Sequence, residues 1–131
     1  MITATLKTYR QTPRKVRLVA DLIKGKSVEQ AIAHLNFLPK RASLPLRKLI
    51  DSAVANAQHN FGAEKSELMV KDVRVDKGVV MRRFMPRARG SASPIKKRTS
   101  HIVLVLGKKE PKKTSKASEA KKLTKPVKLK A

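Results

Sequence analysis

One stretch of the sequence restricts the fold more than any other: residues 81–98, which read MRRFMPRARGSASPIKKR. This stretch carries seven positive charges and no negative charge, together with two prolines and a glycine. On both sides of it, apolar and polar residues alternate in the manner of β-strands. Because so charged a segment cannot join a hydrophobic core, we predict that it leaves the body of the protein as an extended hairpin.

The overall charge of the chain points to a polyanionic partner. The 131 residues suffice for one domain with a tail, and the formal net charge is +23, from 32 Lys and Arg against 9 Asp and Glu. Such an excess repels itself in a compact state, so nucleic acid is the favoured partner. An anionic membrane surface is a weaker alternative, because the longest apolar run, Ile102 to Leu106, is far shorter than the roughly 20 residues of a spanning helix. The chain has no cysteine, which excludes disulfides and thiolate metal sites.

Apolar periodicity predicts a short first strand over residues 2–7 and then three helices. The first helix is expected to have Thr12 as N-cap and Pro13 as first residue, and to stop at Gly25. A capping box of Ser27 and Gln30 begins the second helix. The predicted apolar faces are Val16, Val19, Ala20 and Ile23 in the first helix, supported by Leu18 and Leu22; Val28, Ala31, Ile32 and Leu35 in the second; and Leu46, Leu49, Ile50, Ala53, Val54 and Ala57 in the third, which ends before Gly62.

Two positions are expected to interrupt these regular patterns. Pro45 should kink the start of the third helix or delay it to about Leu44, because proline breaks an interior turn. In the strand that begins at Leu68, the apolar phase changes between Val70 and Val73, which predicts a bulge near 71–72.

These elements give a predicted α+β fold: three helices packed on a small antiparallel three-stranded sheet, with a long protruding β-hairpin over residues 79–100. The predicted domain spans residues 1–106. Residues 107–131 contain ten lysines and two glutamates with almost no apolar pattern, which predicts a disordered basic tail.

The hairpin 79–100 has the composition of a nucleic-acid-binding element. Its arginines are suited to bidentate phosphate binding and base stacking, whereas lysine is a mobile point charge. Each arm is about ten residues long and extends roughly 30 Å. Because a lone two-stranded ribbon is marginal in water and its like charges repel, we expect it to be ordered only against a polyanion. Phe84 either stacks on a base or packs on Met81 or Met85; the alternative for the whole segment is a basic loop without a specific role.

A second cationic site is expected at the start of the first helix, where Arg10, Arg14, Lys15 and Arg17 surround Pro13. Cations there oppose the helix macrodipole at a cost of a few tenths of a kcal/mol each. Their placement is favourable if a phosphate occupies the same site, and the alternative is an ordinary solvated basic face.

The remaining polar residues do not form a catalytic pattern. His34, His59 and His101 lie on separate elements, with no paired carboxylates near them in sequence. Asn56 and Asn60, one turn apart on the third helix, either contact RNA or form a solvated face and a C-terminal cap. No phosphate-binding loop, nucleophile elbow or metal-ligand spacing is present, so we expect neither catalysis nor a metal or other cofactor.

Three motifs carry a resemblance to a known family: TPRKVRLVADLIKGKSVEQAIAHL, SAVANAQHNFG and MRRFMPRARGSASPIKKRTSHIVLVL. Over residues 1–106 the chain resembles the universal large-subunit ribosomal proteins numbered twenty-two. The resemblance implies a structural ribosomal protein, monomeric within the ribosome, that binds several domains of 23S rRNA and assists subunit assembly. It also implies a body near the exit of the nascent-peptide tunnel, a hairpin tip that lines this tunnel, and neighbouring ribosomal proteins as partners. The implied location is a cytoplasmic ribosome, or an organellar one if the protein is encoded there.

The resemblance, together with the charge pattern, gives the expected site residues. The expected rRNA-binding residues are Arg10, Thr12, Pro13, Arg14, Lys15, Arg17, Asn56, Asn60, Arg82, Arg83, Phe84, Pro86, Arg87, Arg89, Gly90, Lys96, Lys97, Arg98, Thr99, Ser100 and His101. The expected tunnel-lining tip consists of Arg87, Ala88, Arg89, Gly90, Ser91 and Ala92. Ser91 and Pro94 stand where the family often has arginine, so we expect fewer phosphate contacts at this tip.

Two other classes of protein share parts of this pattern. Nucleoid-type DNA-bending proteins also join a small α/β body to long basic ribbons, but they act as dimers. A basic ribonuclease would use His34, His59 or His101 in catalysis.

Overall fold

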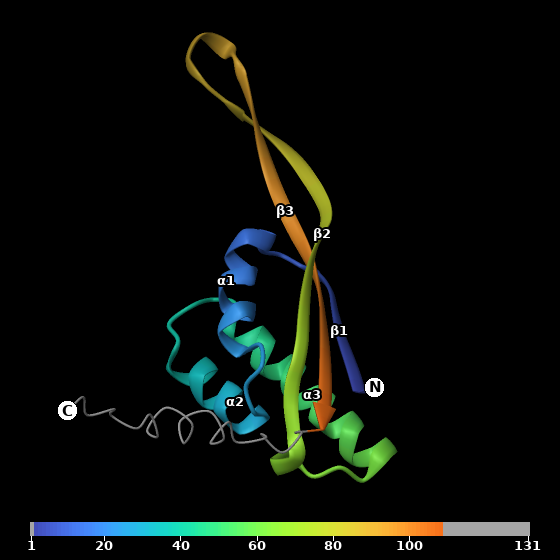
Figure 1. The fold of residues 1–131 in the computed structure, drawn as a ribbon. Helices are drawn as coiled ribbons and strands as arrows, with labels where there is room; N and C mark the ends of the chain where they lie inside the picture. Colours follow the sequence, from blue (N-terminus) through green and yellow to red (C-terminus); the bar gives the residue numbers. More distant parts are fainter. Residues whose placement is uncertain (1, 109–131) are drawn as a thin grey trace, which may run out of the picture.

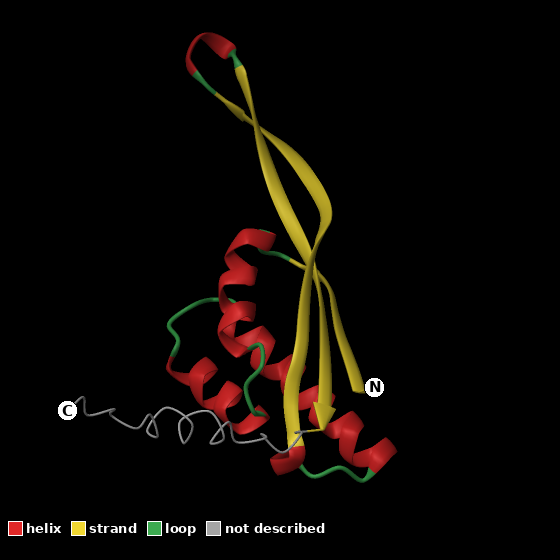
Figure 2. Cartoon of the chain, viewed as in Figure 1, coloured by secondary structure: helices red, strands yellow, loops and turns green. Residues whose placement is uncertain are grey.

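The computed structural model describes residues 2–108, which form one layer of helices on one face of an antiparallel sheet (Figures 1 and 2). Within this range the elements are β1 (Ile2–Tyr9), α1 (Pro13–Ile23), α2 (Val28–Phe37), α3 (Ser43–Phe61), β2 (Leu68–Pro86) and β3 (Ala92–Lys108). The strand order is β1-β3-β2, and β2 and β3 continue well beyond the helices as a two-stranded ribbon. The predicted α+β architecture with a long hairpin is confirmed. Gly107 and Lys108 extend β3 past the predicted domain end, and the rest of the predicted tail lies outside the described residues.

The core forms between the helices and one face of the sheet. In β3, the side chains of Ile102, Leu104 and Leu106 are buried and alternate with partly exposed residues, as the period of two requires. In β2, Val70 pairs with Leu106 and Val73 pairs with Leu104, while Lys71 has no partner in the ladder. This bulge places Val70 and Val73 on the same face although they are three residues apart. The bulge predicted near residues 71–72 is confirmed.

The helices bury a narrower stripe than the sequence indicates. Val16, Val19, Ala20 and Ile23 of α1 are buried as predicted, as are the predicted residues of α3. Leu18 and Leu22, predicted to support this core, are instead 69% and 48% exposed. At 3.6 residues per turn, both lie more than about 100° around the helix from the centre of the buried stripe. In α2, Ile32 is only partly buried.

The helix ends follow the predicted signals with small differences. Ser27 caps α2, since its Oγ accepts a hydrogen bond from the Gln30 N–H at 3.4 Å. Thr12 occupies the N-cap position of α1, but its side chain makes no capping hydrogen bond. Helix α3 begins at Ser43, one residue before the delayed start expected at Leu44. Pro45 is therefore in the first turn, where the missing N–H has no helical partner to lose.

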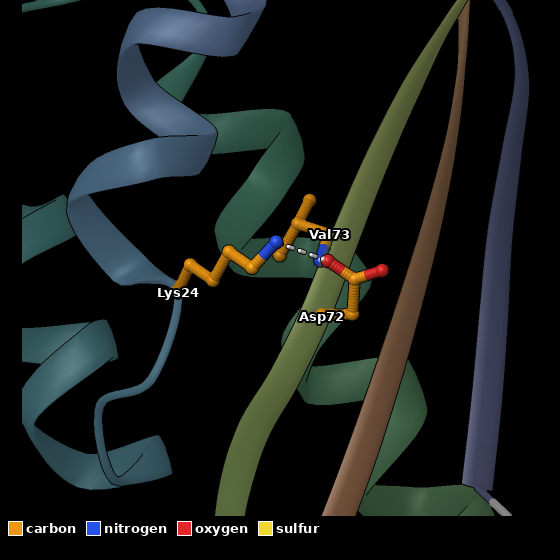
Figure 3. Close-up of polar contacts among 3 residues, drawn as sticks. All are labelled: Lys24, Asp72 and Val73. Atoms are coloured by element: carbon orange, nitrogen blue, oxygen red, sulfur yellow. Dashed lines mark hydrogen bonds and ion pairs between the residues drawn. The ribbon is translucent and has the colours of Figure 1, made fainter.

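The outer edge of β2 is held by the chain that follows α1. The Gly25 N–H donates to the Val70 carbonyl and the Val70 N–H donates to the Lys26 carbonyl, both at 2.9 Å. Figure 3 shows the next contact along this edge: Lys24 Nζ lies 2.7 Å from Asp72 Oδ1, which also accepts a hydrogen bond from the Val73 N–H. The hydrogen bond from Lys24 lowers the pKa of the Asp72 carboxyl, and the same bond raises the pKa of Lys24. These contacts cover an edge that would otherwise be open and fix the strand below the ribbon.

Candidate nucleic-acid interface

The ribbon, residues 79–100, has no side-chain core of its own. Its strands pair continuously from Val80 opposite Arg98 to Pro86 opposite Ala92. Between residues 81 and 98 every side chain is exposed except that of Ser93, which is partly exposed. Arg82 lies directly opposite Lys96, so like charges face each other across the strands as expected. Among the described residues, the body makes no contact that neutralises these charges.

The register divides the ribbon into two faces of different chemistry. Paired residues share a face, and successive pairs alternate between faces. One face carries Arg82, Lys96 and Arg98, followed by Phe84 opposite Pro94. The other face carries Met81 opposite Lys97, Arg83 opposite Ile95, and Met85 opposite Ser93. Both faces therefore present cations, which bind phosphates, beside apolar side chains, which contact the planes of bases.

The tip of the ribbon is a tight turn built from predicted tunnel-lining residues. The Arg87 N–H donates to the Ser91 carbonyl at 2.8 Å, and the Ser91 N–H donates to the Ala88 carbonyl at 3.3 Å. Arg89 and Gly90 both have positive φ, at 58° and 71°. Glycine adopts this conformation freely, whereas arginine does so at a cost. Gly90 is therefore at the turn, as expected, and the Arg89 side chain extends from a strained backbone.

The root of the ribbon is formed by a second bulge in β2. Lys77 pairs with Ser100 and Val80 pairs with Arg98, so Gly78 and Val79 together lie opposite Thr99. The Thr99 hydroxyl donates to the Val79 carbonyl at 2.7 Å. A Cβ atom at Gly78 would lie 2.5 Å from Thr99 Oγ1, so a side chain at this position would displace the Thr99 hydroxyl.

On the other side of β3, β1 is irregular at the same level. Leu6 pairs with Ile102 and Tyr9 pairs with Ser100, and the Thr8 N–H donates to His101 Nδ1 at 3.0 Å. Thr99 and Ser100 are buried, at 4% and 0% exposure. The predicted Thr-Ser-His motif is thus at the base of the ribbon, where its side chains contact protein and shape the transition from three strands to two.

The start of α1 and the root of the ribbon enclose a cationic hollow. The hollow has a volume of about 430 Å³ and is lined by Thr12, Pro13, Arg14, Arg17, Lys77 and Arg98. Figure 1 shows that α1 begins beside the point where the ribbon leaves the sheet. No acidic residue lines the hollow, and the positive end of the α1 macrodipole adds to its positive potential. The arrangement is suited to bind a phosphate group.

Arg17 has a structural contact within this hollow. Its Nε and Nη2 donate to the Val75 carbonyl at 3.2 and 2.8 Å. Because a guanidinium has five N–H donors, Arg17 can hold the edge of β2 and still present donors to the hollow. Lys77 was missed by the sequence interpretation, since its position depends on the bulge at Gly78 and no local pattern distinguishes it from other exposed lysines.

Several predicted residues are not brought to this hollow. Lys15 lies on the other flank of α1, and Arg10 is exposed just before the helix. Asn56 and Asn60 are exposed near the end of α3, at the end of the body opposite the ribbon (Figure 1). The Asn60 side chain lies 3.2 Å from His59 Nδ1, and the helix is capped by Gly62 rather than by an asparagine.

The histidines do not converge on a site, since His34 is on α2, His59 on α3 and His101 in β3. Within residues 2–108, no three His, Asp or Glu side chains are grouped as metal ligands. None of the helices in this range is long and apolar enough to cross a membrane.

Comparisons with known proteins agree with this geometry. Residues 4–107 match the family model described as ribosomal protein L22p/L17e. A relative named large ribosomal subunit protein uL22, from Lactobacillus delbrueckii subsp. bulgaricus, is 54% identical over 103 residues, which cover 79% of this chain and 88% of the relative. The protein of the same name from Pediococcus pentosaceus is 52% identical over 107 residues, 82% of this chain and 91% of the relative. Because the match covers the helical body and the ribbon together, the chain belongs to the ribosomal protein L22p/L17e family and is a structural ribosomal protein rather than an enzyme.

Proposed function

We propose that this chain is a structural constituent of the large ribosomal subunit that binds 23S rRNA through its ribbon and through the hollow at the root of the ribbon. The observation that carries this proposal is the ribbon itself. A strand pair with seven cations, no acid and no buried side chain between residues 81 and 98 gains little from folding alone. Folded RNA supplies the phosphates and the surfaces that such a ribbon lacks.

Binding proceeds by long-range attraction followed by docking. The net charge of +23 draws the chain to RNA at a rate that depends on salt. The hollow holds a phosphate between Arg14, Lys77 and Arg98, while Arg17 keeps α1 attached to β2. The ribbon then inserts between RNA segments, where its arginines bind phosphates and Phe84, which is 72% exposed, stacks on a base.

The tip has a separate role in this proposal. Residues 87–92 line the tunnel through which the nascent peptide leaves, and the small side chains of Gly90, Ser91 and Ala92 let the turn pass through a narrow gap. By binding several rRNA domains at once, the body and the ribbon assist assembly of the subunit beside neighbouring ribosomal proteins. The protein acts as a monomer in a cytoplasmic or organellar ribosome.

Residues at the ribbon's base act indirectly in this scheme. Thr99 and Ser100 are buried, and His101 accepts a hydrogen bond from β1, so these three orient the ribbon, and their contact with RNA stays a prediction. Contact of RNA with Asn56 and Asn60 stays a prediction. Membership of the family argues against both the DNA-bending and the ribonuclease alternatives.

The test compares the tip with the lysine-rich tail. In cells that depend on the variant protein, Arg87→Ala with Arg89→Ala should reduce the yield of large subunits on sucrose gradients more than deletion of residues 109–131. A double variant of two exposed lysines on the body, Lys48→Ala with Lys65→Ala, removes the same charge and serves as control. Equal losses in all three would show that the ribbon supplies only generic charge.

A second measurement tests the assignment to the subunit. The protein should remain with large subunits that are pelleted after a high-salt wash, because a ribbon enclosed by RNA cannot exchange as free cations do. Complete release by salt would contradict an inserted ribbon.

A further inference from the structure

The flank of α1 that faces away from the hollow carries a groove of different chemistry. The groove has a volume of about 390 Å³ and is lined by Gln11, Lys15, Leu18, Val19, Leu22, Leu38, Lys40 and Arg41. Its floor is aliphatic, and its main apolar surface comes from Leu18 and Leu22, which are 69% and 48% exposed. We name it the leucine groove. Leu18 and Leu22 are one turn apart and lie beside Leu38. Together they form an apolar surface that is a candidate binding site.

The leucine groove is separate from the RNA-facing surface described above. The two linings share no residue. At 3.6 residues per turn, Lys15, Leu18 and Leu22 lie on one side of α1 and Pro13 and Arg17 lie about 150° away, with Arg14 between the two sides. The buried stripe of α1 faces the core, on the opposite side of the helix. The hollow and the leucine groove are therefore both accessible from solvent. The other wall of the groove is the segment that joins α2 to α3, which passes beside α1 (Figure 1).

The rim of the groove is cationic and partly fixed in place. Lys15, Lys40 and Arg41 surround the aliphatic floor, and no acidic residue lines it. The Tyr9 hydroxyl donates to the Arg41 carbonyl at 3.2 Å, which ties the α2–α3 segment to β1.

Three candidate occupants of the leucine groove, namely the tail, a second copy of the chain and RNA, can be compared by their charge and chemistry. The tail beyond Lys108 contains nine lysines against two glutamates, so the cationic rim repels it. A second copy of the chain, at a net charge of +23, is repelled for the same reason. RNA would satisfy the rim, but the groove has no aromatic side chain on which a base stacks, and its aliphatic floor offers nothing to a phosphate.

We propose that the leucine groove binds a peptide segment of another protein, in which leucine-like side chains alternate with carboxylates. The apolar side chains cover Leu18 and Leu22, and the carboxylates pair with Lys15, Lys40 and Arg41. This partner is distinct from the rRNA and from the nascent peptide, and the inference does not depend on the ribbon binding RNA.

The experiment uses the full chain and three defined probes at about 0.15 M salt, where exposed charges are partly screened. The first probe is the capped peptide ELDELLDE, the second is ESDESSDE with the same charge, and the third is hexauridylate RNA. We expect the leucine peptide to bind about tenfold or more tightly than the serine peptide. In methyl-labelled protein, it should shift the NMR signals of Leu18, Leu22 and Leu38.

Single substitutions locate the binding. Leu18→Ser and Leu22→Ser should each reduce the affinity for the leucine peptide toward that for the serine peptide, while Phe61→Ser, an exposed residue at the far end of α3, should not. Because all three side chains are exposed, the fold should persist, and the urea midpoint verifies this.

Other outcomes overturn the proposal. Equal affinity for the two peptides would show that only charge is recognised. Shifts of the same three methyl groups on addition of hexauridylate, as large as those from the leucine peptide, would show that the groove binds RNA. The Arg87→Ala with Arg89→Ala variant should bind the leucine peptide normally, so failure here is distinguishable from failure of the assembly test.

Discussion

The body and the ribbon are made from the same two strands, yet different forces hold them. In the body, β2 and β3 bury one face of the sheet against the helices, and Leu104 and Leu106 are almost inaccessible to water. Beyond Thr99 the strands still pair residue by residue, but no side chain is buried. The ribbon thus has backbone hydrogen bonds but no buried apolar side chains to stabilise it. Its order therefore depends on a binding partner, whereas the body is stabilised by its own core.

The boundary between the two regions is a specific set of contacts. Gly78 and Val79 bulge out of β2 opposite Thr99, and β1 bulges opposite His101. Below this level β1 pairs with β3 and helices cover the sheet, and above it β2 and β3 continue as a pair without β1 or the helices (Figure 2). Substitutions below this boundary should change the free energy of unfolding, and substitutions above it should change the affinity for RNA.

The largest expected effect is on RNA binding and concerns the ribbon alone. If the protein neutralises about six to ten phosphates, its affinity for deproteinised 23S rRNA should fall by about 10³–10⁵ between roughly 50 and 200 mM salt. Replacing all five ribbon arginines by glutamine should weaken the binding and lower the logarithmic salt slope by about one for each phosphate that the protein no longer neutralises. Filter binding measures both quantities. The urea midpoint of the body should stay unchanged, and an unchanged salt slope would mean that the ribbon is not the region that binds RNA.

The second effect is on stability and concerns the body alone. Leu104→Ala removes a fully buried side chain and should lower the free energy of unfolding by about 2–5 kcal/mol. Ile95→Ala, in the ribbon of the same pair of strands, should change it by less than about 0.5 kcal/mol. Urea unfolding followed by circular dichroism gives both values, and similar losses would mean that the ribbon has a core of its own.

The third prediction concerns the boundary. Gly78→Ala places a methyl group against Thr99 Oγ1 and should cost about 1–3 kcal/mol. Thr99→Ala removes the hydrogen bond to the Val79 carbonyl, at about 1 kcal/mol, but also removes the clashing atom. In a double-mutant cycle, Gly78→Ala should therefore cost less in the Thr99→Ala background. Simple additivity would show that these residues do not act together.

The smallest effect is that of the Lys24–Asp72 ion pair, whose side chains are 54% and 41% exposed. The hydrogen bond from Lys24 lowers the pKa of the Asp72 carboxyl below its ordinary value of 3.8. The ionised carboxylate therefore stabilises the fold above that value, and this contribution disappears as the pH falls through the lowered pKa. The melting temperature of Asp72→Asn should lie slightly below that of the unchanged protein at neutral pH and equal it in strong acid. Lys24→Met should behave in the same way, and a difference independent of pH would contradict this account.

Local periodicity was enough to predict the elements of this fold. The 3.6-residue period located the three helices, and the change of apolar phase after Val70 located the first bulge. The same reasoning predicted that Leu18 and Leu22 support the core because both are apolar. Their positions on the helix face away from the buried stripe, and both side chains are exposed.

The candidate site was only partly predictable. The cations of α1 and of the ribbon were recognisable by composition, but their meeting in one hollow depends on the bulge at Gly78, which also brings in Lys77. The contact of Arg17 with the Val75 carbonyl was not predictable either, because it depends on which edge of the sheet α1 covers. Long-range geometry, which no local pattern encodes, decides such features.

The absence of buried side chains between residues 81 and 98 affects how the length of the ribbon can change in evolution. Because nothing in that segment packs on the core, residues can be added to or removed from both arms without rearranging the helices. Steps of two residues per arm keep each side chain on its face and change the reach by roughly 7 Å. The length of the projection can thus be adjusted to the depth of whatever it enters, independently of the domain that supports it.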